Sequence, residues 1–137
     1  MSAVEPVFAD LRRATQPGEP SAAWLLWSLR RIDAEPGGDW DVHTFWQREW
    51  NEAAAFEIVT ALARLLSVMR AAVRRPLQLG TEEPTAHEVS LLAALSAVCR
   101  GEATRCDAHL LWLARAAARA DLRAALEEVA ASFARPA

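Results

Sequence analysis

Apolar residues recur at intervals of three and four along most of this chain, which is the spacing of helices that bury one side. The pattern is clearest in the middle of the sequence. There the apolar stripe consists of Ala55, Ile58, Leu62, Leu65, Met69 and Ala72. We expect a helix from about 44 to 75, ended by Pro76 and, because it is long, kinked near Asn51. Polar residues cover only about a third of its circumference, so neighbours must surround it and it is the central helix.

The flanking segments predict further helices. A second apolar stripe follows Ser21, a possible N-cap, and consists of Ala22, Leu25, Leu26, Leu29 and Ile32. Thr44 with Gln47, and Thr85 with Glu88, have the spacing of capping boxes, and Gly101 ends the helix that the second box begins. Strand-like alternation is not sustained anywhere. We therefore predict an all-α fold, a compact bundle of four to six helices.

The last quarter of the chain can be read in two ways. Residues 107–118 and 121–134 carry separate apolar stripes, and Asp121 can cap the second of two helices. One continuous helix would instead align Arg115, Arg119, Arg123 and Glu127 in a solvated row. We favour two helices with a break at Ala120.

The chain has the length and composition of one folded domain. It has 137 residues, of which 53% are hydrophobic, and we assign residues 1–137 to a single helical domain with a short N-terminal arm, 1–20. No stretch approaches the ~20 apolar residues of a membrane span, and no secretory signal opens the sequence. We expect a cytoplasmic protein without a membrane partner, in which Cys99 and Cys106 stay reduced.

The six tryptophans are the most informative residues, since no tyrosine accompanies them. At 100° per residue, Trp24, Trp27 and Arg31 fall opposite the apolar stripe of their helix. Either the N-terminal arm, which contains Val7, Phe8 and Leu11, covers them, or they contact a partner protein or a second copy. Trp46 and Trp50, one turn apart, either close one end of the bundle or belong to a binding surface.

Residues that could support metal binding or catalysis form no recognisable motif. Cys99, Cys106 and His109 match no zinc spacing. Residues 33–44 place oxygen ligands at several calcium-loop positions, but Thr44 occupies the twelfth position, where a glutamate is needed. No nucleophile has an evident base, and no phosphate-binding glycine loop is present. We predict no catalytic residue, no metal and no cofactor, and hence a protein that is not an enzyme.

Residues 108–111, Ala-His-Leu-Leu, resemble the start of the phosphorylated helix in histidine phosphotransfer domains, which are helical bundles of similar size. The resemblance implies His109 as the phosphorylated residue. It covers only these four residues. Trp112 and Leu113 stand where that family has a basic residue and then a glycine, so the site would be occluded.

A nucleic-acid role is disfavoured by charge. Arg64, Arg70, Arg74 and Arg75 gather toward one end of the central helix, but the formal net charge is −3. Our leading hypothesis is a non-enzymatic interaction, regulatory or assembly subunit that binds another protein or a second copy. The predicted partner-binding residues are Trp24, Trp27, Arg31, Trp46 and Trp50. The alternative is a bundle that binds a small molecule or cofactor, with residues 40–50 as an aromatic pocket wall and His43 or Arg48 at its rim.

Overall fold

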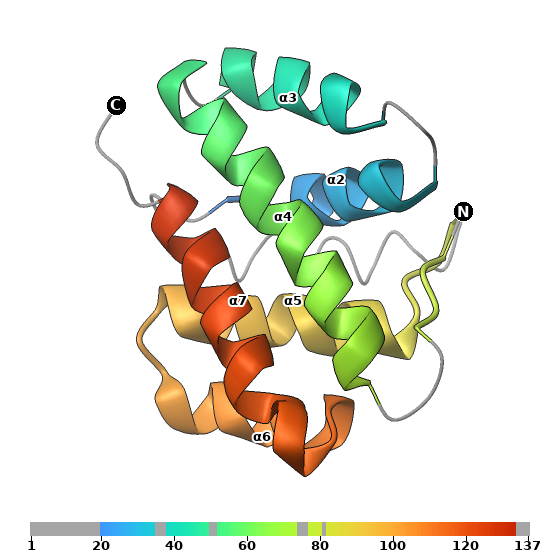
Figure 1. Cartoon of the computed structure of the whole chain (residues 1–137), viewed down its shortest axis with the longest axis vertical. Helices are drawn as coiled ribbons and strands as arrows, with labels where there is room; N and C mark the ends of the chain where they lie inside the picture. The colour runs from blue at the N-terminus through green and yellow to red at the C-terminus, as the bar shows by residue number, and fades with distance from the viewer. Residues whose placement is uncertain (1–19, 35–37, 50–51, 74–76, 81, 134–137) are drawn as a thin grey trace.

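The computed structural model describes residues 20–34, 38–49, 52–73, 77–80 and 82–133, which form six α-helices and a 3₁₀ turn (Figure 1). The helices are α2 (Ala22–Ala34), α3 (Gly38–Glu49), α4 (Glu52–Ala72), α5 (Ala86–Cys99), α6 (Ala103–Leu113) and α7 (Arg119–Phe133). The turn, η1, spans Ala116–Ala118. These residues include no strand, so the predicted all-α bundle is confirmed. None of the described helices combines the length and apolarity needed to cross a bilayer.

Helix α4 is the centre of the bundle. It packs against α7, α3 and α2, and Figure 1 shows it in green, crossing the molecule beside the red α7. All six residues of its predicted apolar stripe are buried. Helix α5 packs against α6, α7 and α2 and completes the core from the opposite side. The apolar period of α4 thus predicted both its burial and its central place.

The helix expected over residues 44–75 differs from the structure at both ends. Helix α4 ends at Ala72, Val73 forms a bridge, and Pro76, expected to end the helix, lies outside the described residues. Helix α3 ends at Glu49 and α4 begins at Glu52, which divides the segment near the kink expected at Asn51. Thr44 is not an N-cap, because it lies inside α3 and its hydroxyl donates to the Trp40 carbonyl at 3.0 Å. The division allows α3 to lie across α2 and α4 and to bury Val42 and Trp46. One straight helix would carry these two side chains away from the core.

The C-terminal half confirms one predicted cap and corrects one boundary. Thr85 and Glu88 form the expected capping box, and Gly101, with φ of 71°, follows the end of α5. Two helices follow, as predicted, but the break lies at residues 114–118 and not at Ala120. Ala114 is extended and forms an antiparallel bridge with Val73. This long-range pairing ends α6, and no local sequence signal indicates it.

Candidate interaction surface

The second apolar side of α2 faces α3. Phe45 of α3 lies against both indoles of α2, with ring centroids 4.3 Å from Trp24 and 5.3 Å from Trp27, while the two indoles are 5.8 Å apart. We call Trp24, Trp27 and Phe45 the aromatic surface. The sequence offered two covers for the indoles, the N-terminal arm or a partner, and the structure supplies a third in α3. Residues 1–19 lie outside the described residues.

Arg31 belongs to the same side of α2 and fixes α3 beside it. Its Nη2 and Nε donate to Oδ2 of Asp41 at 2.7 Å and 3.1 Å. Asp41 precedes Phe45 by one helical turn, so the ion pair and the aromatic contacts lie along one seam. Phe45 was not among the predicted partner-binding residues, because the helix was expected to begin at Thr44 and not at Gly38. In a helix that begins at Gly38, Asp41 and Phe45 lie on the same side, where Asp41 can pair with Arg31 and Phe45 can contact the two indoles.

Trp24 remains accessible within this arrangement. Its side chain is 47% exposed, whereas Trp27 is more covered and packs against the core. Leaving about half of an indole of ~250 Å² in water forgoes roughly 3 kcal/mol of burial. The three rings are too close together to enclose a cation, as an aromatic cage would. The aromatic surface is therefore an apolar area in which the Trp24 indole stays about half exposed.

The other two predicted partner-binding tryptophans have different places. Trp46 is only 3% exposed; its Nε1 donates to Ser28 Oγ at 2.9 Å, and its ring packs on Phe45 and Phe133. It is a core residue and presents no surface to a partner in this fold. Trp50 lies outside the described residues.

Trp40 is an exposed tryptophan apart from the aromatic surface. It is 71% exposed and stacks on His43. It precedes Phe45 by five residues, which places it about 140° away around α3. Trp40 and Phe45 therefore do not form one contact area.

A second exposed apolar pair lies on α6, where Leu111 is 56% and Trp112 54% exposed. The Trp112 ring meets His87 of α5 edge to face at 6.0 Å. This pair was not among the predicted partner-binding residues. The sequence signal for it is the helical spacing, because Leu110 and Leu113 occupy the core side and leave Leu111 and Trp112 outside.

Among the described residues, the cysteines and histidines form neither a metal cluster nor a disulfide. Within the described segments, no group of three or more His, Cys, Asp or Glu side chains is placed to hold a metal ion. No disulfide joins Cys99 and Cys106. Burial raises the pKa of the Cys106 thiol above its ordinary value of 9.0, which disfavours the nucleophilic thiolate. His109, singled out by the phosphotransfer resemblance, is half-buried on α6 at the edge of a cavity between α2, α5 and α6.

Comparison with known proteins finds no matching family model, no matching curated protein and no matching solved structure.

Proposed function

We propose that this protein is a non-enzymatic, cytoplasmic interaction subunit that binds another protein through the aromatic surface. The observation that carries the proposal is the half-exposed indole of Trp24, held in place by Phe45 and Trp27. Tryptophan is enriched among residues that dominate binding energy. A ring already fixed by its neighbours loses little conformational entropy when a partner covers it.

The charges beside the aromatic surface favour a particular kind of partner. Arg31 is neutralised by Asp41 at one end of the seam. Arg48 follows Phe45 by one turn of α3, is exposed, and forms no ion pair among the described residues. A segment that places an apolar side chain on Trp24 and a carboxylate on Arg48 would complement both features.

The test compares tryptophans of similar exposure. A photo-crosslinking amino acid is introduced in living cells at position 24 or, as a matched control, at position 112. We expect a discrete crosslinked product from position 24 and none from position 112. The mass of the product shows whether the partner is a different protein or a second copy, because a product of two copies would have twice the mass of the chain. Light scattering on the purified protein then measures any self-association directly.

Substitution completes the test. W24S removes the proposed contact, and W112S and W40S remove exposed indoles elsewhere. We expect only W24S to abolish the complex, measured as co-purification of the partner that the crosslink identifies, with helicity retained in all three variants. Assembly that survives W24S, or a crosslink at position 112 in place of 24, would contradict this use of the surface. Unfolding by W24S would instead assign Trp24 a structural role.

A further inference from the structure

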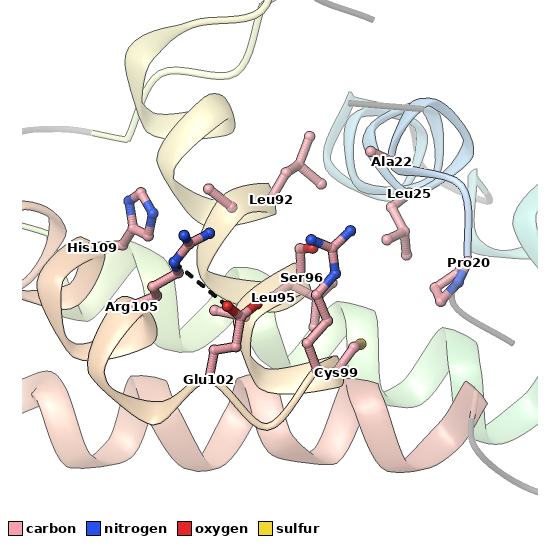
Figure 2. A pocket seen from close by; sticks show the side chains of 13 residues that line it. Pro20, Ala22, Leu25, Leu92, Leu95, Ser96, Cys99, Glu102, Arg105 and His109 are labelled. Carbon is pink, nitrogen blue, oxygen red and sulfur yellow. Dashed lines mark ion pairs between the residues drawn. The ribbon is translucent and has the colours of Figure 1, made fainter. Parts of the chain in front are cut away.

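A cavity of about 190 Å³ lies between the start of α2, the outer side of α5 and the first turns of α6. Figure 2 shows Ala22 and Leu25 on one side of it, and Arg105 and His109 on the other. Leu25, Leu92 and Leu95 supply apolar walls. None of the residues around it belongs to the aromatic surface or to residues 40–50, so it is not the aromatic pocket expected from the sequence.

The polar groups of the cavity are mostly basic. Arg100, Arg105 and the imidazole of His109 line it, and Glu102 is the only carboxylate among its lining residues. Ser96 adds a hydroxyl group at the same wall. This balance differs from the chain as a whole, whose formal charge is −3. An anion entering the cavity would gain charge-assisted hydrogen bonds beside an apolar wall.

Arg105 can exchange its present partner at little cost. Its Nε lies 3.5 Å from Oε2 of Glu102, which is a long ion pair between exposed side chains on adjacent turns (Figure 2). Such pairs contribute little to stability in water. Glu102 also precedes α6 without a side-chain hydrogen bond to the helix, so the first N–H groups of α6 add positive potential.

We propose that this cavity binds a small organic carboxylate, with the carboxylate beside Arg105 and the apolar part against Leu25, Leu92 and Leu95. The cavity is smaller than the ~300–1,000 Å³ of sites that hold drug-sized ligands. A ligand of the size of benzoate or hexanoate therefore fits better than a nucleotide or a polypeptide segment. The proposal does not depend on the aromatic surface.

The experiment titrates the purified full chain with benzoate and hexanoate, and with the neutral analogues benzyl alcohol and hexanol, by calorimetry at constant ionic strength. We expect saturable binding of the carboxylates and at least about tenfold weaker binding of the neutral analogues. R105Q should weaken carboxylate binding by about tenfold or more. S96F, which fills the cavity and leaves its charges in place, should abolish binding. R64Q, which removes the same charge from an exposed, ion-paired arginine on α4, should bind as the wild type does.

Three results would overturn the proposal. They are the absence of saturable carboxylate binding, equal binding of the neutral analogues, and an equal loss in R64Q and R105Q, which would indicate general attraction of anions. Should S96F fail to fold, the comparison of R105Q with R64Q still decides the outcome. Retention of carboxylate binding in W24S would show that the cavity acts separately from the aromatic surface.

Discussion

Arg30 and Glu88, 58 residues apart in the sequence, form a two-pronged ion pair between α2 and α5, with Nε and Nη2 each donating at 2.8 Å to a different carboxylate oxygen. Glu88 is 1% exposed. The same carboxylate accepts from the backbone N–H groups of Thr85 at 2.8 Å and Gly80 at 3.1 Å. One buried side chain thus closes the capping box of α5, fixes the preceding loop and attaches α2.

We predict that E88Q lowers the free energy of unfolding by about 3 kcal/mol. The substitution leaves the Arg30 guanidinium, itself mostly buried, without a countercharge. The matched control is E128Q, because Glu128 pairs with Arg64 at 2.9 Å on the surface. This substitution should lower the free energy of unfolding by less than about 1 kcal/mol. Urea denaturation of the two variants measures both values. Equal small losses would mean that the buried pair contributes no more than an exposed one.

Stability should decrease in acid because of the same carboxylate. Burial alone would raise the pKa of Glu88, but hydrogen bonds from Arg30, Thr85 and Gly80, together with the charge of Arg30, bring the pKa below its ordinary value of 4.5. A folded-state pKa below the unfolded one gives stability that is present above pH ~4.5 and is lost as the pH falls through the folded pKa. The free energy of unfolding, measured at several pH values from about 6 to 3, should change less for E88Q than for the wild type. An equal change in both proteins would contradict the lowered pKa of Glu88.

Ser28 and Trp46 should be energetically coupled. The buried Ser28 hydroxyl donates to the Trp24 carbonyl at 2.8 Å and accepts from the Trp46 indole at 2.9 Å. S28A removes the acceptor of a buried N–H and should cost about 1–3 kcal/mol. In the double variant S28A/W46F no indole N–H remains, so the combined loss should be smaller than the sum of the single losses. Additive losses in a double-mutant cycle would exclude the coupling.

Two glycines should differ in their tolerance of alanine. A Cβ at Gly38 would overlap the backbone carbonyl of Arg31, whereas a Cβ at Gly101 meets nothing within 4 Å and carries only the strain of a φ of 71°. We expect G101A to cost about 1 kcal/mol and G38A more than about 2 kcal/mol. Because Gly38 lets α3 begin beside α2, G38A should also change the near-ultraviolet circular dichroism of the aromatic surface. An unchanged spectrum would mean that α3 keeps its place without this close approach.

The parts of the fold that depend on local periodicity could be predicted from the sequence. The apolar stripe of α4 and the capping box at Thr85 and Glu88 were found because helical burial and end-capping repeat at fixed short spacings. The same reasoning placed Trp24, Trp27 and Arg31 together. It did not place Phe45 against them. The start of α3 at Gly38 depends on a close approach of Gly38 to the backbone carbonyl of Arg31 in the preceding helix, and the periodicity of either helix carries no signal for this contact.

By itself, then, the sequence determined that the chain is helical, which helix is central, and that α2 has two apolar sides, since each follows from the angular spacing of side chains along one helix. Only the tertiary structure decided what those sides meet. It buried Trp46 in the core, left Trp24 half exposed beside Phe45, and ended α6 by pairing Ala114 with Val73. These outcomes depend on contacts between separate elements, and a helical repeat carries no information about which neighbour will cover a given side.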